Sequence, residues 1–168
     1  MTLQELEIYF QTAATNHKEL KEFTWYSLEE ISDRIHQDLL FPCLGLEEPL
    51  SNTGGQGYAN IRLVQNSAFM VFAKVDDAGD HDQIRTQKDL CASIATDVIT
   101  KMIKDRKRWD AGEKDFVLPG LDHDSFTLEF MPQLLHGFLV GVRVTFRINE
   151  PLAQFELGHW ENEMDFDI

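Results

Sequence analysis

The sequence contains few cysteines and no long hydrophobic run. Its two cysteines, Cys43 and Cys91, lie among apolar residues and form no CxxC pair. This pattern favours buried free thiols in a reducing compartment over a disulfide framework. No segment reaches the roughly 18 apolar residues that a membrane span needs. The first ten residues, MTLQELEIYF, lack the basic start and apolar run of a signal peptide, so we expect no export signal and no membrane partner.

Basic side chains are scarce as well. The chain has 15 Lys and Arg against 29 Asp and Glu, which gives a formal net charge of -14. A surface that wraps nucleic acid needs clustered Lys and Arg, so we expect no direct sequence-specific binding of nucleic acid. Acidic solubility is the simplest explanation of the charge. A basic partner, or a surface that must not hold nucleic acid, is the alternative.

The clearest expected element is a strand over residues 138–149, FLVGVRVTFRIN. Its even positions, from Phe138 to Ile148, are apolar, and its odd positions from Gly141 onward are small or polar. Successive side chains of a strand point to opposite faces, so this alternation predicts one apolar and one polar face. The apolar face needs a cover, and the long helix predicted over residues 82–108 can supply it.

That helix has apolar residues at three-to-four spacing, which is typical of a helix packed on a core. They are Ile84, Cys91, Ile94, Ala95, Val98, Ile99, Met102 and Ile103. Asp80 or Asp82 can cap its start, and the basic run KDRKRW near its end complements the helix dipole.

Two capping boxes in the N-terminal region each open a predicted helix. They are Thr2 with Glu5 and Ser27 with Glu30. We expect the first helix to fade near Asn16 or to continue to Glu22, and the second to end before Pro42. The N-terminal part is therefore expected to be a helical lead to the sheet.

The middle of the chain predicts three strands, over residues 43–47, 58–65 and 68–75. SNTGGQG, at residues 51–57, is interpreted as a loop or hairpin turn. It is not a phosphate-binding loop, because no Lys-Ser or Lys-Thr follows it. Asn66 and Ser67 are expected to join the last two strands as a hairpin. The last of these, AFMVFAKV, is apolar on both faces, so it is expected to be central in a sheet or to meet a partner subunit.

Residues 110–124 are expected to form a loop, followed by a strand over Ser125–Met131. The connection PQLLHG is short, so this strand should pair with residues 138–149 as an antiparallel hairpin. Together the elements predict one α+β domain over residues 1–150, with a mostly antiparallel sheet, a long helix packed across one face and an N-terminal helical lead.

Residues 151–168 predict a separate acidic tail. The segment carries five acids, no Lys or Arg, and the aromatic residues Phe155, Trp160 and Phe166. An acidic segment with spaced aromatic side chains is either a frayed terminus or an arm that docks on a neighbour.

Catalytic and metal-binding patterns are weak. The best metal candidate combines two acidic clusters, residues 76–82 and 122–124. Their spacing matches neither an EF-hand loop nor a His-Glu-x-x-His site, so loop acids and helix caps explain them better. No Gly-x-Ser-x-Gly elbow is present, and Cys91 lies mid-helix on an apolar face, a poor place for a thiolate. We therefore predict no catalytic residue, no metal site and no cofactor, and hence a protein that is not an enzyme.

Arg143 and Arg147 share the polar face of the strand over residues 138–149. Pairing with acids is the simplest expectation, and lining a lumen or meeting an acidic neighbour is the alternative. The candidate contacts with subunits or partners are Phe69, Val71, Phe72, Arg143, Arg147, Phe155, Trp160 and Phe166.

Three segments carry a resemblance to a known family. They are ANIRLVQNSAFMVFAKV, DHDQIRTQKDLCASIATDVITKMIKDRKRW and GFLVGVRVTFRINEP. Their order and the length of the chain resemble the tail terminator, or tail completion, proteins of long-tailed phages and related contractile particles. That resemblance implies a small α+β protein in a virion or phage-like particle, assembled in the host cytoplasm.

The resemblance also implies partners. They are further copies of the chain in a ring, with six-fold symmetry as the candidate, together with the tail tube and neck or sheath proteins. A neck or baseplate adaptor is the nearest variant of this hypothesis. An acidic ring would let DNA pass without holding it. The alternatives from other classes are a monomeric α+β binding module for a small ligand or peptide, and a metal-dependent hydrolase.

Overall fold

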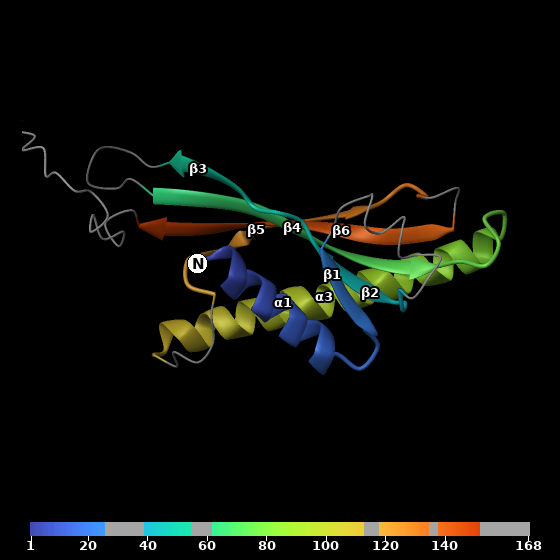
Figure 1. Cartoon of the computed structure of the whole chain (residues 1–168), viewed down its shortest axis with the longest axis horizontal. Helices are drawn as coiled ribbons and strands as arrows, with labels where there is room; N and C mark the ends of the chain where they lie inside the picture. The colour runs from blue at the N-terminus through green and yellow to red at the C-terminus, as the bar shows by residue number, and fades with distance from the viewer. Residues whose placement is uncertain (26–38, 55–61, 113–117, 135–137, 152–168) are drawn as a thin grey trace, which may run out of the picture.

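The computed structural model describes residues 1–25, 39–54, 62–112, 118–134 and 138–151. They form an α+β fold in which two described helices accompany a six-stranded sheet (Figure 1). The elements in chain order are α1 (Leu3–Asn16), β1 (Glu22–Trp25), β2 (Cys43–Leu46), β3 (Leu50–Gly54), β4 (Arg62–Lys74), α3 (His81–Asp110), β5 (Leu121–Phe130) and β6 (Leu139–Pro151).

The long strands β4 and β6, 13 residues each, form the spine of the sheet. They pair antiparallel over their whole length, from Arg62 opposite Pro151 to Lys74 opposite Leu139. The sheet has the order β1-β2-β4-β6-β5, and β3 also pairs with β4. Only the pairing of β1 with β2 is parallel, so the expected mostly antiparallel sheet is confirmed.

Both helices lie on one face of the sheet, which we term the helix-side face (Figure 1). Phe69 and Val71 of β4 lie on this face opposite Val144 and Val142 of β6. The buried residues of α3 that pack against them are Ile84, Cys91, Ile94, Ala95, Val98 and Met102. The predicted cover of the alternating strand by the long helix is therefore confirmed.

The opposite face of the sheet is divided into an apolar end and a polar end. At the apolar end, Met70 and Phe72 of β4 are buried in a second cluster with Leu39, Cys43, Met131 and Leu139. The polar end carries Arg143, Thr145 and Arg147 of β6. Two covers thus account for the strand that is apolar on both faces, one from the helices and one that includes Leu39.

The predicted turn at Asn66 and Ser67 is wrong. These residues lie inside β4, where Asn66 pairs with Leu50 on one side and with Arg147 on the other. Two ladders use the backbone hydrogen-bonding groups here, and the Asn-Ser pair lacks the glycine that favours a two-residue hairpin turn. One continuous strand replaces the two predicted ones.

Two segments that were expected to be loops are partly strands. Residues 51–54 of the expected SNTGGQG loop belong to β3. Residues 121–124 of the expected loop belong to β5, which begins at Leu121 and carries a register shift between Asp122 and Thr127. In both cases pairing with a long neighbouring strand outweighs the local preference of polar residues and glycine for turns.

The N-terminal helix begins as predicted. The Thr2 side chain accepts from the Glu5 backbone N–H, and the Glu5 carboxylate accepts from the Thr2 N–H. The helix ends at Asn16 and does not continue to Glu22, because residues 22–25 form β1, an edge strand with no recognisable sequence pattern. The predicted second helix, from Ser27, falls mainly outside the described residues.

Candidate interaction surfaces

The three apolar residues proposed as partner contacts lie inside the chain's own core. Phe69 and Val71 are fully buried on the helix-side face, and Phe72 is buried in the second cluster on the opposite face. Phe69 packs against Phe10 of α1, with ring centroids 5.4 Å apart. A second subunit is not needed to bury these three side chains, and their contact with a partner stays a prediction.

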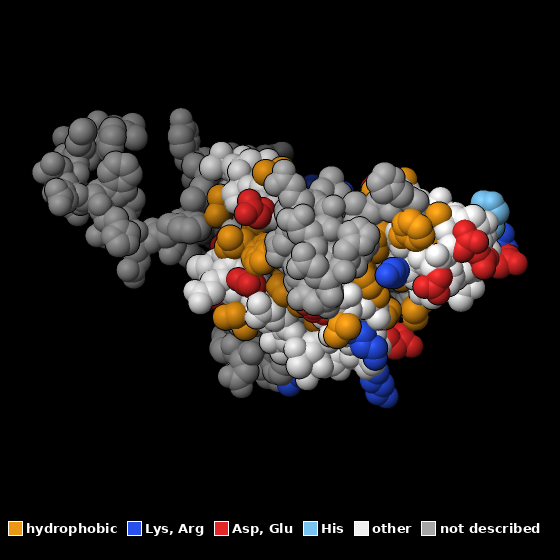
Figure 2. Space-filling view, turned by 45° about the vertical axis from the view of Figure 1, so that its right-hand side comes forward, with side chains coloured by type: hydrophobic (Ala, Val, Ile, Leu, Met, Phe, Trp, Pro, Cys, Tyr) orange, Lys and Arg blue, Asp and Glu red, His pale blue; other side chains and the backbone are white. Residues whose placement is uncertain are grey.

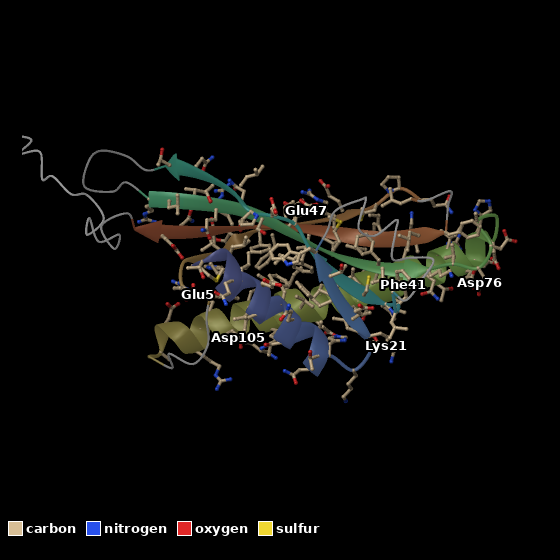
Figure 3. All side chains as sticks on the ribbon, viewed as in Figure 1. Glu5, Lys21, Phe41, Glu47, Asp76 and Asp105 are labelled. Atoms are coloured by element: carbon tan, nitrogen blue, oxygen red, sulfur yellow. The ribbon has the colours of Figure 1, made fainter. Side chains whose placement is uncertain are left out.

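Arg143 is held by an acid of the same chain. Its Nε and Nη2 atoms donate to Glu47 Oε1 and Oε2, each at 2.7 Å. Glu47 follows β2 and lies on the side of the sheet away from the helices (Figure 3). This bidentate geometry gives strong charge-assisted hydrogen bonds. The expectation that Arg143 pairs with an acid is confirmed.

Arg147 is held much more loosely. Its Nε atom lies 3.5 Å from Asn66 Oδ1, and its Nη1 atom lies 3.9 Å from Asp122 Oδ2. The side chain is 49% exposed. Ion pairs of this length and exposure contribute little to stability. Arg147 therefore presents a half-exposed guanidinium group that can bind a better-placed anion.

The two arginines line a shallow depression that we term the polar groove. Its volume is about 270 Å³. The groove is lined by Glu47, Glu48, Leu50, Asn66, Ser67, Ser125, Thr127, Arg143, Thr145, Phe146 and Arg147. Hydroxyl, amide and guanidinium groups predominate, so the groove suits a polar or charged segment better than an apolar ligand. The alternation of β6 predicted that both arginines share its polar face, but only the pairing of β3 with β4 and of β5 with β6 shows which strands flank them.

A second candidate surface lies at the β5 edge of the sheet, where β5 pairs only with β6 among the described strands. Leu128 and Phe130 lie opposite Val144 and Val142, so they belong to the helix-side face. They remain 38% and 55% exposed. Phe138, just before β6, is 41% exposed. We term Leu128, Phe130 and the outer edge of β5 the apolar edge.

Sequence reasoning placed Leu128 and Phe130 on one face of a strand but did not show that they are exposed. The same alternation also describes a buried face. They are exposed because α3 covers mainly β4 and β6 and extends little over β5, which is the outermost strand. The apolar edge is thus a product of the topology.

The two acidic clusters do not combine into a metal site. Asp122 lies beside Arg147, opposite the part of β4 near Asn66, whereas Asp76 follows the far end of β4 (Figure 3). At about 3.3 Å per residue along a strand, the clusters lie roughly 25 Å apart or more. Among the described residues no three His, Cys, Asp or Glu side chains gather closely enough to hold a metal ion.

The acids at the start of α3 have local structural partners. Asp80 Oδ1 accepts from the backbone N–H groups of Asp82 and Gln83, at 3.1 and 3.0 Å, and so caps the helix. Asp77 accepts from the Gly79 N–H at 2.8 Å. These acids gather at the end of the molecule where α3 begins (Figure 2). These acids therefore stabilise the start of α3 and do not form a ligand site.

A buried polar cluster joins α1 to α3. The Tyr9 hydroxyl donates to Asp105 Oδ2 at 2.8 Å, and Lys101 Nζ donates to the same oxygen at 2.7 Å. Asp105 is only 4% exposed and lies between the helices (Figure 3). Burial, followed by the hydrogen bond and the negative charge of Asp105, raises the pKa of Tyr9 well above its usual range. The hydrogen bonds satisfy the buried carboxylate, so this cluster is a packing contact.

The remaining candidates give no further site. Burial raises the pKa of the Cys91 thiol to about 12, so this cysteine is a poor nucleophile. Phe155, Trp160 and Phe166 lie outside the described residues. No described helix has an apolar stretch long enough to cross a bilayer. Comparison with protein-family models and with curated protein sequences finds no match, so a function has to be inferred from these surfaces themselves.

Proposed function

We propose that the chain is a non-enzymatic structural subunit that assembles with copies of itself into a ring, and that this ring closes the tail tube of a phage-like particle. The observation that carries the assembly is the apolar edge. The place in a particle rests on the resemblance of the segment pattern to tail terminator proteins.

The apolar edge combines two features that favour association. An edge strand presents unpaired backbone N–H and C=O groups that can pair with another strand. Natural edge strands are often protected by charged side chains, Pro or a β-bulge. β5, LDHDSFTLEF, has no Lys or Pro, and its register shift lies between Asp122 and Thr127, before the two exposed apolar residues. Burying a Leu or Phe side chain contributes about 1.5–3 kcal/mol. Exposed Leu128 and Phe130 would thus be covered by a strand that pairs with β5.

A ring requires that β5 meet a different surface on the next copy, because only a head-to-tail contact continues around an axis. The described sheet offers such surfaces in β1 and β3, each of which pairs with one neighbour in the described part of the chain. Pairing of β5 with itself would instead close a two-fold dimer. The net charge of -14 suits a ring through which DNA passes without being held.

The edge is tested by changing one exposed side chain. Phe130→Lys should release subunits from the assembly, because it places a solvated charge where an apolar side chain would be buried. Ile8→Lys is the matched control, since Ile8 is 53% exposed and lies on α1 rather than on β5. Sedimentation velocity should show a loss of the large species for Phe130→Lys only. Equal behaviour of the two variants would argue against contact through β5.

The polar groove favours a second candidate function, a monomeric module that binds a peptide. A groove with a loosely held arginine and several hydroxyl groups suits an acidic segment. The two functions differ in oligomeric state. The binding module is favoured over the ring if the chain stays monomeric and an acidic peptide slows backbone amide hydrogen exchange at the groove.

A further inference from the structure

We propose that the polar groove receives the acidic C-terminal segment, residues 152–168, of a second copy of the chain. This inference rests on the proposed ring, because it names the part of one subunit that the next one holds. It assigns a partner to the groove on the face of the sheet that the described helices leave open.

Arg147 is the side chain of the groove that can bind a further carboxylate, in a lining that also carries the carboxylates of Glu47 and Glu48. Arg143 already has a carboxylate partner in Glu47 at 2.7 Å. Arg147 contacts Asn66 and Asp122 only at 3.5 and 3.9 Å. Charge-assisted hydrogen bonds are normally about 2.7–2.9 Å long. A carboxylate placed in the groove can therefore make a shorter bond to Arg147 than its present contacts provide.

The C-terminal segment has the matching chemistry. It contains five acids and no Lys or Arg. Its aromatic residues can cover Leu50, which is 77% exposed and lies at the groove. The hydroxyl groups of Thr127 and Thr145 offer further donors to carboxylates. The groove would thus offer hydrogen-bond donors to the acidic side chains of the segment and an apolar surface at Leu50 to its aromatic side chains.

The direction of β6 favours a second copy over the same chain. β6 runs past the groove at Arg147 and ends at Pro151, at the end of the sheet opposite the start of α3 (Figure 1). The segment would have to reverse its direction to enter its own groove. Fully extended, 17 residues span roughly 55–60 Å, enough to reach an adjacent subunit in a ring.

A photo-crosslink tests this contact in the full-length chain. Leu50 is replaced by the photoreactive residue p-benzoylphenylalanine, and the assembled species is isolated by size and irradiated. We expect a product of two chains on a denaturing gel, and a cross-linked tryptic peptide that contains residues 152–168. A cross-link within one chain, or one to any other segment, would overturn the proposal.

Charge variants distinguish a specific effect of Arg147 in the groove from a general effect of the net charge of the chain. Arg147→Glu should lower the yield of the two-chain product about ten-fold, because it replaces attraction by repulsion. Lys107→Glu makes the same charge change at an exposed position on α3 and should leave the yield unchanged. On the segment itself, E161K with E163K should reproduce the loss. Equal yields for Arg147→Glu and Lys107→Glu would overturn the proposal.

The outcomes also separate this inference from the ring. An assembled species of ring size whose probe at Leu50 attaches elsewhere would leave the ring in place and remove the docked segment. A chain that remains monomeric at every concentration would contradict the ring, and with it the second copy on which the docking depends.

Discussion

At the scale of single residues, two glycines adopt the left-handed backbone conformation in different surroundings. Gly120 has φ +78° and Gly112 has φ +94°. A Cβ atom on Gly120 would lie 2.1 Å from the Asn149 carbonyl oxygen, while one on Gly112 would meet nothing within 4 Å. The Gly120 carbonyl also accepts from the Asn149 N–H at 2.8 Å. Gly120 thus fixes how the start of β5 approaches β6.

Substitution by alanine should separate backbone strain from steric conflict at these positions. We expect Gly112→Ala to lower the free energy of unfolding by about 1 kcal/mol, the cost of the left-handed conformation. Gly120→Ala should cost a further ~1–3 kcal/mol because the backbone of Asn149 must move. Urea denaturation measures both values. Equal losses for the two variants would show that the close approach to Asn149 is unimportant.

Two buried side chains that ionise at high pH, a thiol and a phenol, should make the protein less stable at alkaline pH. The Cys91 pKa rises from 9.0 to about 12 on folding, and that of Tyr9 rises from 10.0. Both groups stay neutral in the folded chain after they ionise in the unfolded chain. Their contribution is therefore fully present below pH 9 and is lost as the pH rises, by up to about 1.4 kcal/mol per pH unit for each group.

Single substitutions of Cys91 and Tyr9 show how much of this loss of stability each side chain causes. Cys91→Ala should reduce the decline in the free energy of unfolding between pH 9 and 11, and Tyr9→Phe should reduce it above pH 10. The measurement is a series of urea denaturation curves from pH 8 to 11. A decline with the same slope in the Cys91→Ala variant and the unchanged chain would mean that this thiol ionises equally in both states.

At the scale of elements, Phe10 joins α1 to the central strands of the sheet. This fully buried ring lies 5.4 Å from the Phe69 ring and 5.9 Å from the Phe146 ring, so it bridges β4 and β6. Tilted aromatic pairs at such distances are favourable beyond the area they bury. The Tyr9–Asp105 hydrogen bond then joins the same helix to α3.

Removal of the Phe10 ring should therefore be strongly destabilising. We expect Phe10→Ala to lower the free energy of unfolding by about 3–5 kcal/mol, since it leaves a cavity between α1 and the sheet. Ile8→Ala, on the exposed side of the same helix, should change it by less than about 0.5 kcal/mol. Thermal or urea denaturation followed by circular dichroism gives both values. A small effect of Phe10→Ala would mean that α1 contributes little to the core.

Elements with their own periodic signal were predictable from the sequence. The alternation of β6, the spacing of α3 and the Thr2–Glu5 capping box each specify local structure directly. β1 was missed because its four residues are too short for a periodic pattern and pair in parallel with β2. The continuity of β4 through Asn66 was missed because it depends on β6, which lies far along the chain.

At the scale of the whole molecule, the candidate surfaces follow from topology that sequence patterns do not contain. The pairing of Arg143 with an acid could be expected from its place on a polar face, but its partner Glu47 is 96 residues away. The apolar edge exists because β5 is outermost in the described sheet and is only partly covered by α3. The helix cover of β4 and β6 could be predicted, whereas the limit of that cover could not.

The most direct test of the proposed ring is the mass of the full-length chain in solution, measured by multi-angle light scattering over a range of concentrations. One chain has a mass of 19.4 kDa. The proposed function predicts a discrete species whose mass is a fixed multiple of that value, with closed rings of the same size in negative-stain images. A single-chain mass at every concentration, with no rings in the images, would contradict it.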